Sequence, residues 1–387
     1  MKRREFIKFS ALTAALLTLP SALLAVESIP EDKIVVLVEL EGGNDGLNTV
    51  IPYQDQLYYT LRGSLGVAKE EVLPLDKNLG LHPKLSKLKE IWDTEELAVI
   101  LGVGYPNPNR SHFRSIDIWT TASDSDQYLS EGWIGKLFRE YPVSDNFFSD
   151  SLTIGNDDTK PFEASGMNNI VFDSPQSFIK KAGTVPHIEV STKDEMLSHV
   201  IKTQNDLADA VEMLKTKIEN PIEIKTEFPA SKLGNKLKNI ALLLANDIKA
   251  PVFKVALGSF DTHQNQAPVH ERLLQELSEA LAAFKEGLKE SGYWDKTVIM
   301  TYSEFGRRVE VNASNGTDHG TAAPHFMLGG KIKGGLYSTQ PALDDLDENG
   351  DLKYTTDYRS LYQTIIKNWW GIENSFLKEF PAIGCIS

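Results

Sequence analysis

Four short apolar runs, rich in β-branched residues, constrain the fold of this chain more than any other feature. Each ends where a polar loop or a glycine begins, and three of them are followed by glycine within two residues. Nearly continuous apolar runs of this length are typical of strands that are buried on both faces of a sheet. We therefore predict strands at residues 34–40, 97–101, 252–257 and 297–302.

Helical patterns lie between these strands, at residues 83–92, 231–245 and 268–291. Strands that alternate with helices indicate an α/β fold, with a mostly parallel central sheet flanked by helices on both faces. Residues 26–387 have a length that suits a single domain of this kind. Residues 120–200 are rich in Ser, Asp, Asn and Pro and show little clear period, so we expect an irregular insertion or cap beside the sheet there.

The first 25 residues have the pattern of an export signal. Arg3 and Arg4 precede a short apolar stretch that ends in small residues near Ala25. This pattern resembles a twin-arginine signal, and a membrane anchor is the alternative. The stretch is short for a spanning helix, which needs about 20 residues, and it contains Pro20. We expect export by the twin-arginine route to the periplasm or the cell exterior, with membrane attachment only through an uncleaved signal.

The rest of the chain is strongly acidic. Residues 1–25 carry four basic side chains and one acidic side chain, which leaves 36 Lys and Arg against 53 Asp and Glu and a net charge of −17. Such a surface repels phosphate backbones, so nucleic acid is not an expected partner. The sequence has one cysteine, Cys385, which excludes internal disulfides and zinc sites built from four cysteines. Any metal must be held by His, Asp, Glu and water.

Polar loops that follow the predicted strands carry the candidate metal ligands. In an open α/β sheet, ligands bind outside the carboxyl ends of the strands, so these loops share one location. Four of the eight histidines lie in them or just beyond. Imidazoles with carboxylates suit one or two divalent ions, zinc or manganese first, whereas calcium or magnesium, the alternatives, would use fewer histidines. The candidate ligands are Asp45, Asp261, His263, Glu304, Asp318, His319 and His325.

The segment after the second predicted strand supplies the candidate catalytic residues. Ser111 could be an attacking hydroxyl that an adjacent metal deprotonates. Arg110 and Arg114 flank it and offer donors that suit a tetrahedral oxyanion, and His112 lies beside it. Two ions about 4 Å apart could clamp both oxygens of an in-line displacement at phosphorus or sulfur. These residue types therefore point to ester hydrolysis.

Each of the ligand residues also has a structural interpretation. Asp45 lies in an Asn-Asp-Gly sequence that is typical of a turn, and Asp318 could shape a turn in the same way. Asp261 could cap a helix, and Glu304 could pair with a neighbouring arginine. Their convergence after successive strands is what favours a shared site.

Five segments together resemble the DUF1501 family of exported bacterial proteins. They are LEGGNDGLNTVIPY, GVGYPNPNRSHFRSIDIWTTA, GSFDTHQNQ, TYSEFGRRVEVNASNGTDHGTAAPHFMLGG and TTDYRSLYQTIIKNWWG. The resemblance places the chain among alkaline-phosphatase-like folds, together with sulfatases and phosphodiesterases, and implies a two-metal site at the carboxyl edge of the sheet. By this resemblance Asp45 matches a metal-binding aspartate, and Ser111 matches the nucleophile. Asp261 and His263 resemble the later aspartate and histidine metal motif, and His319 matches the final histidine motif, to which Asp318 is an addition.

One position departs from the superfamily pattern, because Ser303-Glu304 stands where Asp-His is usual after the fourth strand. The resemblance implies an exported metal-dependent hydrolase of phosphate or sulfate esters, with a small-molecule or glycan ester as substrate. The alternative is a non-catalytic metal-binding or assembly protein that retains the fold and has a partner protein in the periplasm. The departure at Ser303-Glu304 favours the alternative.

Overall fold

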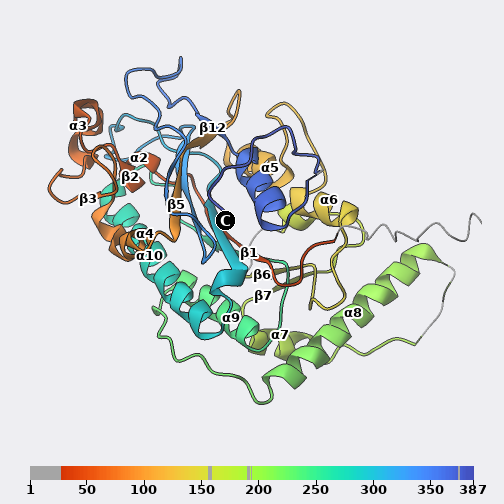
Figure 1. Ribbon diagram of the computed structural model, residues 1–387. Helices are drawn as coiled ribbons and strands as arrows, with labels where there is room; N and C mark the ends of the chain where they lie inside the picture. Colours follow the sequence, from red (N-terminus) through yellow and green to blue (C-terminus); the bar gives the residue numbers. More distant parts are fainter. Residues whose placement is uncertain (1–27, 156–158, 190–191, 193, 374) are drawn as a thin grey trace, which may run out of the picture.

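The structure is a computed structural model that describes residues 28–155, 159–189, 192, 194–373 and 375–387 (Figure 1). The expected export signal at residues 1–25 lies outside this range. None of the helices in the described part combines the length and the apolar character that a membrane crossing requires.

One large sheet organises the molecule. Within the described residues it has nine strands, namely β1 (Ile34–Leu40), β5 (Leu97–Gly104), β6 (Ser151–Ile154), β7 (Asn169–Phe172), β8 (Val252–Leu257), β9 (Thr297–Tyr302), β10 (Ala323–Leu328), β11 (Gly335–Tyr337) and β12 (Thr356–Asp357). Their order is β11-β5-β10-β9-β1-β8-β6-β7, and β12 pairs with β5. β10 is antiparallel to β5 and β9, whereas the other pairings are parallel. The central strands are in register, with Glu39 between Ala256 and Tyr302.

Helices cover both faces of this sheet. One face packs against α4 (Ser86–Asp93), α9 (Lys232–Ala245) and α10 (Gln266–Glu290), and the other against α5 (His112–Thr121), α6 (Trp133–Glu140), α11 (Arg359–Gln363) and the π-helix η5 (Thr364–Trp369). Figure 1 shows α4, α9 and α10 on the opposite side of the sheet from α5 and α6. On α10 the leucines that face the sheet are buried, namely Leu273, Leu274, Leu277, Leu281 and Leu288. The prediction of a mostly parallel α/β fold with helices on both faces is therefore confirmed.

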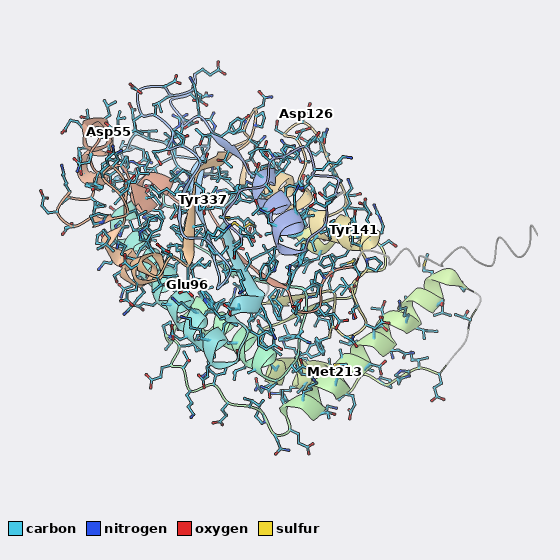
Figure 2. All side chains as sticks on the ribbon, viewed as in Figure 1. Asp55, Glu96, Asp126, Tyr141, Met213 and Tyr337 are labelled. Carbon is cyan, nitrogen blue, oxygen red and sulfur yellow. The ribbon has the colours of Figure 1, made fainter. Side chains whose placement is uncertain are left out.

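The remaining elements surround this core. They are α2 (Gly46–Thr49), α3 (Gln56–Arg62), η1 (Gly63–Leu65), η2 (Pro83–Leu85), η3 (Lys160–Phe162), α7 (Pro175–Ala182), α8 (Glu195–Ile218) and η4 (Trp294–Lys296), with a small sheet β2-β4-β3 made of β2 (Val50–Ile51), β3 (Leu73–Pro74) and β4 (Gly80–Leu81). Figure 2 marks Asp55, whose carboxylate caps the start of α3, and Met213 on α8, which is 45% exposed.

Residues 120–200 differ from the expected irregular insertion or cap. β6 and β7 lie in this region and continue the main sheet in parallel beyond β8. Leu152, Ile154, Ile170 and Phe172 on these strands are buried in the same apolar core as α9 and α10. The strands have four residues each, so their apolar runs are too short to stand out among the polar residues around them.

Candidate metal centre

Loops at the carboxyl ends of the central strands converge on one place. Asp261 and His263 follow β8, Glu304 follows β9, and His112 begins α5 after β5. Because these strands run parallel, their loops leave the sheet at the same edge. Four of the predicted site residues are thereby carried to one end of the sheet by the topology alone.

His319 reaches the same edge through a short antiparallel pairing, in which Arg307 and His319 form an isolated bridge. The connecting segment crosses close to the loop after β8. A Cβ at Gly316 would lie 2.2 Å from the carbonyl carbon of His263, so a glycine is needed at this crossing. The small residues of GTDHGTAAPHF therefore allow this segment to lie directly on another loop of the site.

The hydrogen bonds of His319 assign its tautomer. Nδ1 lies 2.7 Å from the carbonyl oxygen of Arg110, which can only accept, so Nδ1 carries the hydrogen. Nε2 then holds a lone pair, and it lies 3.2 Å from Oδ1 of Asp261. Burial lowers the pKa of His319, which keeps the ring neutral. A neutral ring with a free Nε2 lone pair is the form that binds a metal.

His112 is held in the same way by a carboxylate. Its Nδ1 lies 2.8 Å from Oε1 of Glu304, and the same oxygen accepts a hydrogen bond from the backbone N–H of Gly42 at 2.8 Å. Nε2 of His112 faces Oδ2 of Asp261 at 3.6 Å. The hydrogen bond to Glu304 raises the pKa of His112. A histidine with a carboxylate behind it and its second nitrogen free is a common arrangement at metal centres.

Asp261 lies between the two histidines. Its Oδ1 accepts from Nη2 of Arg307 at 2.6 Å, while its carboxylate as a whole is 46% exposed. Burial alone would raise the pKa of Asp261, but the hydrogen bond and the charge of Arg307 outweigh it and lower the pKa to about 2. The group is therefore an anion at neutral pH, with Oδ2 turned toward His112.

These side chains fit a divalent cation. His112, Asp261 and His319 offer ligand atoms that all lie within 4.8 Å of one another. Nε2 of His263 adds a fourth atom, 2.9 Å from Nε2 of His319 and 3.0 Å from Oδ1 of Asp261. Ligands around a tetrahedral zinc ion with bonds of about 2.0–2.1 Å lie about 3.4 Å apart. Because lone pairs this close repel one another unless a proton or a cation lies between them, the donor set and its spacing suit zinc or a similar ion.

The profile of a family described as a protein of unknown function, DUF1501, matches residues 32–380 of this sequence. The chain belongs to the DUF1501 family. The resemblance drawn from the five sequence segments is thus confirmed. A comparison with curated protein sequences gives no significant match.

Solved structures similar to this DUF1501 protein include a protein in the alkaline phosphatase superfamily from Vibrio parahaemolyticus, with 14% identity, a TM-score of 0.41, and coverage of 94% of this chain and 73% of that chain. The phosphonate monoester hydrolase SpPMH from Silicibacter pomeroyi has 10% identity, a TM-score of 0.45 and coverage of 90% and 76%. The C-terminal periplasmic domain of EcEptC from Escherichia coli, in complex with Zn, has 10% identity, a TM-score of 0.39 and coverage of 79% and 77%. At such identities the likeness concerns the fold and not the activity.

Five of the seven predicted ligands of this DUF1501 protein lie in or against the cluster. Asp261, His263 and His319 are in it, and Asp318 lies at its edge, with Oδ1 3.2 Å from Nδ1 of His263. Glu304 stands behind His112 as its hydrogen-bond partner. His112, predicted as a catalytic residue, lies in the cluster as a candidate ligand.

Asp45 does not join the cluster. Its carboxylate is completely buried and forms two hydrogen bonds with Arg62, at 2.6 and 2.8 Å, and it also accepts from Gln266. Asp45 caps α2 through Asn48 as well. The oxygens of Asp45 are thus already engaged by donors. Asp45 forms a buried ion pair with Arg62, contrary to the expectation that it ligates metal.

His325 is likewise placed elsewhere. It lies on β10, is 1% exposed, and packs edge-on against Trp119 with ring centroids 5.4 Å apart. Burial lowers its pKa to about 3. The sequence did not indicate β10, because Pro324 interrupts the run and the pairing with β5 shifts register there. His325 therefore lies in the core and not at the cluster, contrary to the prediction that it ligates metal.

Of the other predicted catalytic residues, Ser111 lies next to the cluster, whereas the side chains of Arg110 and Arg114 point elsewhere. Ser111 is exposed at the N-cap of α5, next to His112, and its side chain makes no capping hydrogen bond. The side chain of Arg110 pairs with Asp351 at 3.0 Å, so that only its carbonyl oxygen serves the centre. Arg114 is buried against Asp117 and the ring of Tyr128. Neither guanidinium is aimed at the cluster.

Sequence reasoning missed the role of Arg307. Its completely buried side chain donates to the carbonyl oxygens of Gly42, Gly43, Phe260 and Thr317 as well as to Asp261. It thus ties the loops after β1, β8 and β9 together. A signal was present, since the arginine directly follows the Ser-Glu-Phe-Gly segment, but it suggested only a local pair with Glu304.

Proposed function

We propose that this protein is a metal-dependent hydrolase of phosphate or sulfate esters that acts outside the cytoplasm. The observation that carries the proposal is the convergence of His112, Asp261 and His319, with both histidine Nε2 lone pairs turned toward one carboxylate. His263 supports it, because its Nε2 lies within 3.0 Å of atoms of Asp261 and His319. A divalent cation in such a set supplies a Lewis acid that polarises the ester and lowers the pKa of a bound hydroxyl or water.

Ser111 is the proposed nucleophile. It is exposed, it precedes His112 directly, and its hydroxyl is not used to cap α5. Its Oγ would attack phosphorus or sulfur, and the bond from that atom to the oxygen of the alcohol would break. Water would then hydrolyse the serine ester, which releases phosphate or sulfate and restores the Ser111 hydroxyl. The start of the ten-residue helix α5 favours negative charge on the ester oxygens.

In this scheme His263 would carry the proton from the Ser111 hydroxyl to the leaving alcohol. Asp318 accepts from its Nδ1 at 3.2 Å, which orients Nε2 toward the cluster, and the side chain is 43% exposed. With His112, Asp261 and His319 as the cation ligands, Nε2 of His263 would take the proton of the Ser111 hydroxyl and give it to the oxygen of the leaving alcohol, and it would later pass a proton from water back to Ser111. Asp318 then acts through His263 by fixing the ring.

Export by the twin-arginine route forms part of the proposal. Arg3 and Arg4 precede the apolar stretch of residues 1–25, and that route carries proteins that are already folded. A metal centre built from three separate loops requires such a folded state. The periplasm or the cell exterior is the proposed location.

Metal analysis joined to an ester screen tests the proposal. Purified protein should contain divalent metal, and added Zn²⁺ should raise the melting temperature of stripped protein, because a ligand that binds only the folded state stabilises it. His319→Ala should abolish both the metal and the shift. Ser111→Ala should retain the metal and lose turnover of p-nitrophenyl phosphate or sulfate, and full activity in that variant would remove Ser111 from the mechanism. Gln275→Ala, on the exposed side of α10, serves as the control.

A non-catalytic metal-binding or assembly protein is the second candidate. The positions of Arg110 and Arg114 favour it, because both guanidinium groups are engaged away from the cluster and neither can steady charge on a reacting ester. Metal bound by the wild type with no turnover of any ester would support this candidate. Hydrolysis that depends on Ser111 would exclude it.

A further inference from the structure

A small cavity opens beside the candidate metal centre, on the side of His263. It has a volume of about 260 Å³, and its lining includes Arg308, Glu310, Asp318, Leu346 and Asn349. Pockets for drug-sized ligands span about 300–1,000 Å³, so this cavity suits a smaller group. Its lining comes from two segments that are far apart in the sequence, which the fold brings together at this edge of the molecule.

The cavity and the metal centre share a wall. Asp318 lines the cavity, and its Oδ1 lies 3.2 Å from Nδ1 of His263, whose other nitrogen is 2.9 Å from Nε2 of His319. The backbone N–H of Arg308 donates to the carbonyl oxygen of Asp318 at 3.0 Å, which joins the two walls. A group bound in the cavity would therefore lie one side chain away from the cation ligands.

The polar groups of the cavity are held in place from behind. Asp351 is completely buried and lies 3.7 Å from Nε of Arg308 and 3.0 Å from Nη1 of Arg110. Asn312 donates from Nδ2 to Asp318 at 3.1 Å and to the carbonyl oxygen of His263. The side chains of Arg308 and Asp318 thus have fixed supports while remaining 37% and 53% exposed. Such supports pre-organise a binding surface.

The chemistry of this lining selects a class of ligand. Arg308 can only donate hydrogen bonds, the carboxylates of Glu310 and Asp318 can only accept them, and Asn349 can do both. A hydroxyl group donates and accepts, so neighbouring hydroxyls satisfy both kinds of partner. Two carboxylates against one guanidinium disfavour a second anionic group. An apolar group would leave desolvated polar atoms without partners, which costs binding energy.

We propose that this cavity, lined by Arg308, Glu310, Asp318, Leu346 and Asn349, binds the alcohol part of the ester substrate, and that this part is neutral and rich in hydroxyls, such as a sugar ring. The inference rests on the proposed function, since it places the leaving group of the same reaction. Leu346 supplies an apolar surface on which the carbon face of a sugar can lie.

Kinetics with matched esters test the cavity. The metal-loaded enzyme should hydrolyse glucose 6-phosphate or glucose 6-sulfate with a kcat/KM at least about 10-fold above that for n-butyl phosphate or n-butyl sulfate, because the hydroxyls meet partners that the butyl chain leaves unpaired. Asn349→Ala, an exposed position, should lower this ratio several-fold through KM, whereas Gln275→Ala should not change it. A ratio near one in the wild type would overturn the inference.

Binding without turnover separates this inference from the proposed function. Methyl α-glucoside should bind metal-loaded protein, as measured by calorimetry or by shifts in NMR spectra, and Asn349→Ala and Glu310→Gln should each weaken that binding. If no ester is hydrolysed and the glucoside still binds in this manner, the hydrolase proposal fails and the cavity assignment stands. Absence of glucoside binding, or binding that neither substitution weakens, would refute the cavity assignment whatever the outcome of the ester screen.

Discussion

Nη2 of Arg307 lies 2.6 Å from Oδ1 of Asp261, and it joins a completely buried guanidinium to a half-exposed carboxylate. Nε and Nη1 of Arg307 donate to the carbonyl oxygens of Gly43 and Thr317, and Nη2 also donates to that of Phe260, so the arginine fixes both the loops and the direction of the carboxylate. Oδ1 is thereby engaged, and Oδ2 is left facing His112 at 3.6 Å. The orientation of a central candidate ligand is thus set by a residue outside the cluster.

Arg307→Lys should therefore be costly although it keeps the charge. A lysine offers one ammonium in place of a planar fork of donors, so several buried carbonyl oxygens would lose their partners. We expect the free energy of unfolding to fall by about 3 kcal/mol and Zn²⁺ affinity to fall with it. Urea denaturation and calorimetric titration measure the two effects. Arg308→Lys is the neighbouring control, expected to change stability by less than about 1 kcal/mol; equal effects of the two substitutions would contradict the assigned role of Arg307.

Glu304→Gln should weaken metal binding without unfolding the protein. The carboxylate accepts from Nδ1 of His112 at 2.8 Å, and an amide at this position can instead donate to Nδ1 and favour the wrong tautomer of the ring. Substitution of such a partner typically costs 10–100-fold in metal affinity. Titration of stripped protein with Zn²⁺ measures the loss. Glu90→Gln, an exposed position on α4, is the control, and unchanged affinity in Glu304→Gln would show that Glu304 does not orient His112 for metal binding.

Strand positions could be predicted where the pattern was local and long. Residues 34–40, 252–257 and 297–302 are strands with the predicted limits, because each is a nearly continuous apolar run buried on both faces. β6 and β7 escaped prediction because four residues give too short a pattern. The edge of the sheet at which the site lies could also be predicted, because the carboxyl ends of parallel strands meet at one edge.

Individual partners could not be predicted, because they depend on contacts distant in the sequence. Arg62 neutralises Asp45 from α3, and Arg307 reaches carbonyls that are 264 and 47 positions away in the chain. Asp45 follows a strand just as Asp261 does, so strand position alone could not tell a buried ion pair from a candidate ligand. Asp261 remains 46% exposed at the cluster, whereas Asp45 is completely enclosed.

Asp45→Asn should destabilise the fold and leave metal content unchanged. The substitution leaves the guanidinium of Arg62 buried without its counter-charge, and breaking a buried pair by removing one partner typically costs about 3–5 kcal/mol. Asp93→Asn removes an exposed partner of Lys89 and should cost about 0.5 kcal/mol at most. Urea denaturation compares them. If Asp45→Asn instead lost metal at unchanged stability, Asp45 would be a ligand after all.

The buried histidine His270 should make the protein sensitive to mild acid. Its Nε2 lies 2.9 Å from Oδ1 of Asn44, and burial lowers its pKa from 6.5 to about 4. The unfolded chain therefore binds the proton more readily than the folded protein does. This contribution to stability is complete above pH 6.5 and is lost as the pH falls toward 4, with about 2 kcal/mol lost by pH 5.

His270→Gln tests this pH dependence, because the amide can still donate to Asn44 but does not titrate. The drop in the free energy of unfolding between pH 7.5 and pH 5 should be smaller in this variant than in the wild type by about 2 kcal/mol. His82, whose ring lies 6.3 Å from that of His270 and whose pKa burial lowers to about 3, keeps part of the acid sensitivity in both proteins. Gln275→Ala, on the exposed side of α10, should leave the wild-type drop unchanged. An equal drop in His270→Gln and the wild type would show that His270 already binds its proton in the folded state, and that the carboxylate of Asp45 accommodates the charge.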